Sequence, residues 1–116
     1  MLRFPWPDSR LSPNSRRAHR WLTDIRAAAR MAGMMITRDA GLAVPVEGAL
    51  QWRLVFCPPD KRRRDDDNVL AAFKSTRDGI FAALETDDRR IRRTVIEWGP
   101  VELGGAVYVE IKMLEA

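Results

Sequence analysis

Two groups of aspartates in this chain have a spacing that suits a metal-binding site. Asp65, Asp66 and Asp67 follow one another directly, and the pair Asp87 and Asp88 comes about twenty residues later. Neighbouring carboxylates repel one another unless a cation lies between them, and their hard oxygen atoms suit Mg²⁺ or Mn²⁺. The two groups therefore predict a carboxylate metal site, although an isolated aspartate triplet at the start of a helix is more often a solvated cap.

Basic side chains precede the first aspartate group and fill the N-terminal quarter of the chain. The chain carries 20 Lys and Arg residues against 16 Asp and Glu, and seven of its arginines lie in the first thirty residues. A guanidinium group donates two parallel hydrogen bonds to a phosphate, so this distribution favours a polyanionic partner. The codon preference of a GC-rich genome explains the arginine content equally well. The predicted phosphate contacts are Arg16, Arg17, Arg20, Arg62, Arg63 and Arg64.

Cysteine and histidine are nearly absent, which excludes several kinds of site. Cys57 and His19 are the only residues of their types. We therefore expect no disulfide, no structural zinc site and no Cys-His nucleophile pair within one chain. The sequence contains no run of about 18 apolar residues and no signal-peptide pattern, so we expect no membrane association and a cytoplasmic protein. The length of 116 residues predicts a single domain over residues 1–116.

The hydrophobic pattern predicts four strands and two main helices in the order β-α-β-α-β-β, which is an α+β fold with a mixed sheet. Pro5 restricts the first strand to a sheet edge, because proline cannot donate a hydrogen bond to a neighbouring strand. Gly33 is the predicted stop of the first helix, and a turn joins the last two strands. The predicted strands are residues 2–6, 49–57, 91–98 and 105–113, and the predicted helices are residues 15–32 and 67–84.

The first aspartate group lies where a predicted strand gives way to a helix. On an extended chain the side chains of Asp65 and Asp67 point the same way, and Asp66 or Asp67 can cap the helix. At about 100° per residue, Lys74 and Asp78 fall on the same helical face as Asp67. Lys74 therefore has two interpretations, a cation beside the acids or the partner of Asp78 in a surface ion pair.

Four features occur in an order that resembles the RusA family of Holliday junction resolvases over most of the chain. They are the opening "FPWP", a polar loop into a basic helix, the run "CPPDKRRRDDDN" and a "DD" pair about twenty residues later. Members of this family are small homodimeric endonucleases that use Mg²⁺ to nick two strands of a four-way DNA junction symmetrically. The resemblance implies a nuclease of DNA recombination and repair that uses Mg²⁺, or Mn²⁺ in its place, and no small-molecule cofactor.

The resemblance also implies roles for the aspartates. Asp65, Asp67 and Asp88 correspond to the catalytic carboxylates that hold the metal, and Asp87 is an auxiliary ligand. Such metal ions polarise the phosphoryl oxygen and generate hydroxide in phosphodiester hydrolysis. For Asp88 to join the other two, the chain must fold back along the helix predicted for residues 67–84.

One position departs from the family pattern. Family members usually have a lysine three residues after the asparagine, and this chain has Ala71 three residues after Asn68. We interpret Lys74 as the functional equivalent, because Lys74 and Asp78 keep the usual Lys-x-x-x-Asp spacing, and we expect Asn68 to orient a carboxylate or contact DNA. Two alternatives are a junction-binding protein of the same fold that has lost catalysis and a nuclease that acts on flaps or replication forks.

Overall fold

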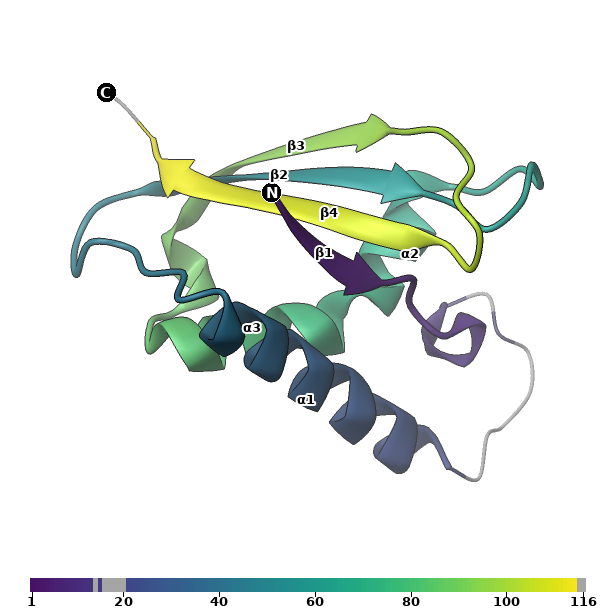
Figure 1. The fold of residues 1–116 in the computed structure, drawn as a ribbon, viewed down its shortest axis with the longest axis horizontal. Coiled ribbons are helices and arrows are strands. Elements are labelled where there is room, and N and C mark those ends of the chain that lie inside the picture. The colour runs from purple at the N-terminus through teal and green to yellow at the C-terminus, as the bar shows by residue number, and fades with distance from the viewer. Residues whose placement is uncertain (14, 16–20, 115–116) are drawn as a thin grey trace.

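The computed structural model describes residues 1–13, 15 and 21–114, and it has an α+β fold. A four-stranded mixed sheet lies on one side, and the α-helices found among these residues cover one of its faces (Figure 1). The predicted α+β class is therefore confirmed. Arg16, Arg17 and Arg20, three of the predicted phosphate contacts, lie outside the described residues. No helix in the described ranges is long and apolar enough to cross a membrane.

The strands begin and end within one residue of their predicted positions, but their order in the sheet was not foreseen. That order is β1-β4-β2-β3, with β3 parallel to β2 and β4 antiparallel to both β1 and β2. The last two strands of the chain therefore flank β2 and do not pair with each other, although one turn joins them. The strands are β1 (Leu2–Pro5), β2 (Leu50–Cys57), β3 (Ile91–Trp98) and β4 (Ala106–Met113).

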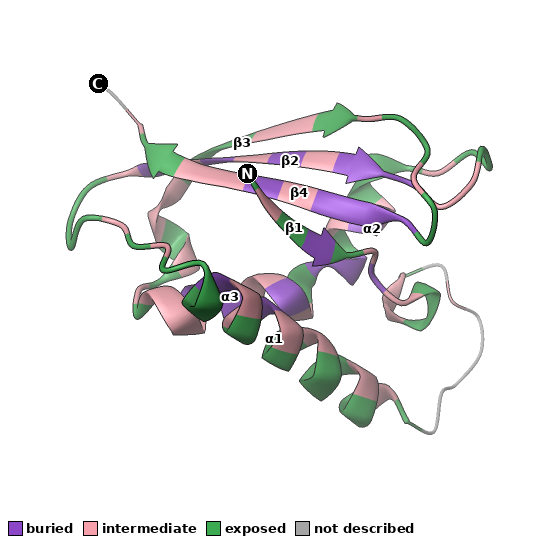
Figure 2. Cartoon of the chain, viewed as in Figure 1, coloured by how far each residue is buried: buried purple, intermediate pink, exposed green. Residues whose placement is uncertain are grey.

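One face of the sheet forms the core. Along β2 the residues Leu50, Trp52, Leu54 and Phe56 are all at most 1% exposed, while the residues between them are partly exposed. This alternation follows from the period of two along a strand, and it places every second side chain against the helices. Figure 2 shows buried residues along β2, β4 and the part of α3 that faces the sheet. Among the described strands β1 pairs with β4 alone and is therefore an edge strand, as Pro5 predicted.

The first helix, α1 (Leu22–Asp39), continues six residues beyond the predicted stop at Gly33. Gly33 is buried inside α1, and a Cβ atom there would collide with the backbone carbonyl group of Thr76. A Cβ atom on Gly79 would likewise collide with the backbone carbonyl group of Arg30. The prediction of a stop was wrong because both glycines serve the close approach of two helices, a tertiary contact that a local helix signal does not show.

The second predicted helix is two helices, α2 (Asp66–Ala72) and α3 (Lys74–Leu84), which meet at Phe73. Phe73 is fully buried, and its ring centroid lies 6.1 Å from that of Phe4 and 6.3 Å from that of Trp52. The prediction that Asp67 and Lys74 share one helical face was therefore wrong, because the two residues belong to different helices.

Candidate nucleic-acid interface

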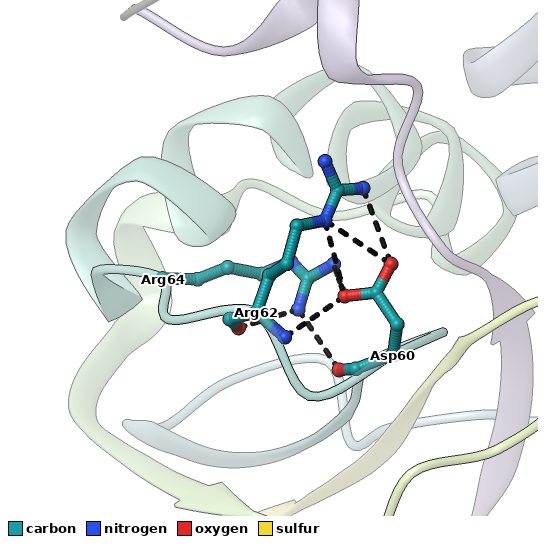
Figure 3. Close-up of polar contacts among 3 residues, drawn as sticks. All are labelled: Asp60, Arg62 and Arg64. Atoms are coloured by element: carbon teal, nitrogen blue, oxygen red, sulfur yellow. Dashed lines mark hydrogen bonds and ion pairs between the residues drawn. The ribbon is translucent and has the colours of Figure 1, made fainter.

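The charged loop of residues 58–65, between β2 and α2, is held together by Asp60 (Figure 3). Its Oδ1 atom accepts hydrogen bonds from the backbone nitrogen and Nε of Arg62, at 3.0 and 3.2 Å, and from Nη2 of Arg64, at 2.7 Å. Hydrogen bonds from the side chain and backbone of Arg62, and then from Arg64, hold the pKa of Asp60 well below its usual range. The ionised Asp60 carboxylate therefore holds Arg62 and Arg64 in place at the start of the basic run.

Arg64 has a structural role in this loop. Its Nη1 atom donates to the carbonyl oxygens of Asp60, at 3.1 Å, and of Arg62, at 2.8 Å. Its guanidinium carbon lies 5.6 Å from the ring centroid of Trp6, a distance typical of a cation–π contact. Only 17% of the Arg64 side chain is exposed. The phosphate contact predicted for Arg64 thus stays a prediction. In the structure the Arg64 side chain binds and stabilises the charged loop.

The other cations of the loop face solvent. The side chain of Arg62 is 81% exposed even though it pairs with Asp60, and Arg63 and Lys61 are exposed as well. Neither Arg63 nor Lys61 forms an ion pair with any residue that the structure describes. These three side chains can reach phosphates without breaking a buried contact.

A first cleft of about 460 Å³ opens between the charged loop, the 3₁₀ turn at Ser9–Leu11 and α2. Trp6, Arg63, Asp65 and Asn68 are among the residues that line it. Asp65 occupies the N-cap position of α2, yet its side chain forms no capping hydrogen bond, so its carboxylate remains available to the cleft. We predicted the N-cap at Asp66 or Asp67, and in the structure it is Asp65.

The two other acids of the first group point elsewhere. A side-chain oxygen of Asp66 accepts a hydrogen bond from the backbone nitrogen of Asp67 at 3.0 Å. Asp67 is exposed and is not among the residues that line the first cleft. The structure thus brings Asp65 and Asn68 together and leaves Asp67 on the adjoining surface.

A second cleft, also of about 460 Å³, lies between α1 and the start of α3. Arg26 and Arg30 of α1 line it together with Ala71, Lys74 and Asp78. Lys74 Nζ lies 3.4 Å from Asp78 Oδ2, which is the surface ion pair that the spacing allowed. Ala71, the position where the resemblance leads one to expect a lysine, lines the same cleft as Lys74.

Arg26 and Arg30 belong to the helix predicted for residues 15–32, but neither is among the individual phosphate contacts predicted from the sequence. Their spacing of four residues places both on one face of α1, which is the signal that could have identified them. What the sequence could not show is that this face borders α3, because that contact depends on the two glycines at the helix crossing.

The second aspartate group has its own partners within the chain. Asp88 Oδ2 lies 3.1 Å from Arg77 Nη2, and Asp87 accepts hydrogen bonds from the backbone nitrogen of Arg89 at 2.8 Å and from its Nη2 at 2.9 Å. The hydrogen bonds from Arg89 lower the pKa of Asp87 to about 2. Both aspartates line a third cleft of about 650 Å³, which shares Arg30 and Asp78 with the second.

The two aspartate groups lie at opposite ends of the sheet. Leu50 at the start of β2 pairs with Ile91 at the start of the parallel strand β3, so Asp88 lies at that end, whereas Asp65 follows the far end of β2. A strand of eight residues is about 25 Å long. Within the described parts of the chain, no three His, Cys, Asp or Glu residues gather into a group that could hold a metal ion. The residues of a single chain therefore do not fit the metal site that the resemblance implies.

Comparison with known proteins relates the chain to a protein of Xylella fastidiosa. No family model matches the chain. An uncharacterized protein of Xylella fastidiosa is 41% identical over 115 residues, which cover 95% of this chain and 74% of the Xylella protein. Identity at this level over nearly the whole chain shows common descent, so the chain belongs to the same protein family as this Xylella protein.

Proposed function

We propose that the protein binds branched DNA and, as a homodimer with bound Mg²⁺ or Mn²⁺, cleaves it in the cytoplasm as an endonuclease of the RusA type. The observation that supports this proposal most is the arrangement of the three clefts. The first and second share Ala72, and the second and third share Arg30 and Asp78. We call these three clefts together the track. It follows α2 and α3, with Asp65 lining one end and Asp88 the other.

The charges along this track suit a phosphodiester backbone. Arg26, Arg30 and Lys74 lie in its middle, and exposed Arg63 lines its first cleft. Exposed Lys61 belongs to the same charged loop as Arg63. Positive side chains that neutralise phosphates supply the sequence-independent part of DNA affinity. The carboxylate in the middle, Asp78, is paired with Lys74, and the other carboxylates of the track lie toward its two ends.

Cleavage requires carboxylates that one chain does not bring together. Asp65 and Asp88 lie at opposite ends of the sheet, so a second chain in the opposite orientation is needed to bring an Asp88 to an Asp65. The homodimer that we propose meets this requirement, and a four-way junction, which has two-fold symmetry, offers two equivalent strands to such a dimer.

A second candidate function is junction binding without cleavage. Two observations favour it, because Lys74 pairs with Asp78 and Asp88 pairs with Arg77 within the same chain. A lysine and an aspartate engaged in this way can be ordinary surface residues. Cleavage and binding must therefore be measured separately.

The experiment compares a synthetic four-way junction with a linear duplex of the same sequence, with Mg²⁺ and with EDTA. We expect tighter binding to the junction in EDTA and paired symmetric nicks after Mg²⁺ is added. Binding without nicks supports the second candidate, and nicks confined to flap or fork substrates identify those structures as the target. Equal affinity for junction and duplex contradicts branch recognition.

The track itself is tested by the salt dependence of binding. Each phosphate contact contributes about −0.9 to the slope of log K against log salt, so replacing Arg26 and Arg30 with alanine should make the slope less negative by roughly 1.8. Arg38→Ala is the matched control, because Arg38 is exposed on the same helix and is not among the residues that line the three clefts. An unchanged slope in the double variant rejects the track.

A further inference from the structure

Strand β3 forms an open edge of the sheet. It pairs with β2 on one side, and in the part of the chain that the structure describes no strand or helix lies beyond its other side (Figure 1). Arg92, Arg93 and Thr94 are exposed, and Trp98 at its end is 45% exposed. An eight-residue strand with unpaired backbone groups is a template for pairing with another chain unless its side chains prevent this.

We propose that β3 pairs with β3 of a second copy of this chain, antiparallel and with Val95 on the two-fold axis, to form a continuous eight-stranded sheet. The inference rests on the sheet alone and holds whether or not the protein cleaves DNA.

The charges along β3 select this register. A two-fold axis perpendicular to the sheet places residues opposite each other only when both lie on the same face. With Val95 on the axis, Arg93 faces the partner's Glu97, and the same pair repeats on the other side of the axis. Arg92 then faces the partner's Trp98, an arrangement that favours a cation–π contact.

The neighbouring registers lose this complementarity. If the axis passes through Thr94, Glu97 faces the partner's Ile91, and if it passes through Ile96, Glu97 faces the partner's Val95. Opposite charges directly across two strands stabilise their pairing, whereas a charge facing an aliphatic side chain does not.

The side chains needed for these contacts are accessible. Arg93 forms no ion pair or hydrogen bond with any residue in the described ranges, and Glu97 is 49% exposed at its side chain. Glu97 already lies 3.1 Å from Arg53 Nη1, but a carboxylate has about four acceptor positions and can serve two arginines.

This pairing also has a consequence for the ends of the sheet. Ile91 of one copy faces the partner's Gly99, so the start of β3 in one copy lies at the sheet end where β2 of the other copy stops. The turn that carries Asp87 and Asp88 then lies at the same end of the joined sheet as the partner's charged loop.

Charge reversal tests the interface without DNA. Sedimentation velocity of the full chain should show a dimer, and Arg93→Glu should weaken its association by about tenfold or more, because two attractive pairs become repulsive. Adding Glu97→Arg to Arg93→Glu should restore association. Lys112→Glu is the matched control, since it makes the same charge change on the interior strand β4 and should leave the dimer intact.

Cysteine crosslinking tests the register. Opposite residues in antiparallel strands have Cβ atoms about 4.5 to 5.5 Å apart, close to the reach of a disulfide, so Val95→Cys should crosslink two chains under mild oxidation. In Glu97→Cys the two cysteines are about 13 Å apart along the strands and should not crosslink. The buried native Cys57 should not interfere. A monomeric parent, or crosslinking by Glu97→Cys but not by Val95→Cys, overturns the proposal.

Discussion

Replacing Gly79 with alanine should destabilise the protein, although this change stabilises an ordinary helix. A Cβ atom at residue 79 would collide with the carbonyl oxygen of Arg30 and stand 2.8 Å from the backbone nitrogen of Met34. Alanine gains about 1 kcal/mol over glycine in helix propensity, whereas forcing a carbon into a tight contact costs about 1 to 3 kcal/mol. The opposing atoms belong to the backbone of α1 and cannot rotate away. We therefore expect a packing cost in the upper part of that range. The free energy of unfolding should fall by about 1 to 2 kcal/mol after the gain in helix propensity is subtracted.

Urea denaturation followed by circular dichroism measures this difference in the free energy of unfolding. Ser75→Ala is the control, because it also introduces alanine into α3, and it should stabilise the fold by a few tenths of a kcal/mol. If Gly79→Ala is as stable as the parent or more stable, the close crossing of α1 and α3 is refuted.

The same substitution should affect DNA binding. The atom that residue 79 would strike is the carbonyl oxygen of Arg30, whose side chain lines the second and third clefts. Displacing α1 moves this guanidinium group relative to Lys74. At a temperature where Gly79→Ala is still folded, we expect weaker binding to the four-way junction than for the parent protein.

Three further predictions concern the charged groups. Lys74→Ala should lower junction cleavage by about 10² to 10³-fold, the scale for one lost transition-state contact, whereas binding should lose only one phosphate contact among several. Moving the lysine to residue 71 should restore part of the activity in a nicking assay. Asp67→Asn should abolish cleavage, because the resemblance makes Asp67 a metal ligand. It should keep or improve DNA binding in a gel-shift assay, because it removes a negative charge near phosphates. The pKa of Asp87 is lowered from 3.8 to about 2, so the ionised carboxylate stabilises the fold above pH 3.8, and this stabilisation is lost as the pH falls through 2. When the free energy of unfolding is measured against pH, Asp87→Asn should lose less stability in this interval than the parent.

The strands could be predicted from the sequence because their signal is local. Buried and partly exposed residues alternate along β2 from Leu50 to Phe56, and this period of two can be read from neighbouring residues alone. The order of the strands could not be predicted in the same way. Whether β4 pairs with β3 or inserts between β1 and β2 depends on contacts between residues far apart in sequence, and the turn before β4 does not reveal them.

The helices show where a local signal misleads. Gly33 has the chemistry of a helix stop, yet it lies inside α1 because the backbone of Thr76 approaches it. Phe73 has the spacing of a helix interior, yet the helix breaks there, and its ring contacts those of Phe4 and Trp52. In both cases a tertiary contact outweighs a propensity of about 1 kcal/mol or less per residue.

The aspartate groups show the same limit at the level of the site. Their types and spacing predicted a metal site, but a carboxylate group assembles only if the chain brings both ends of β2 together. The parallel pairing of β2 with β3 does the opposite, because it places Asp88 beside the start of β2 while Asp65 follows its end. A chain with this sheet can complete such a site only with a second molecule, so any cleavage should depend on protein concentration in the range where the dimer forms. A cleavage rate per chain that stays constant when the protein is diluted well below the dimerisation constant would exclude a shared site.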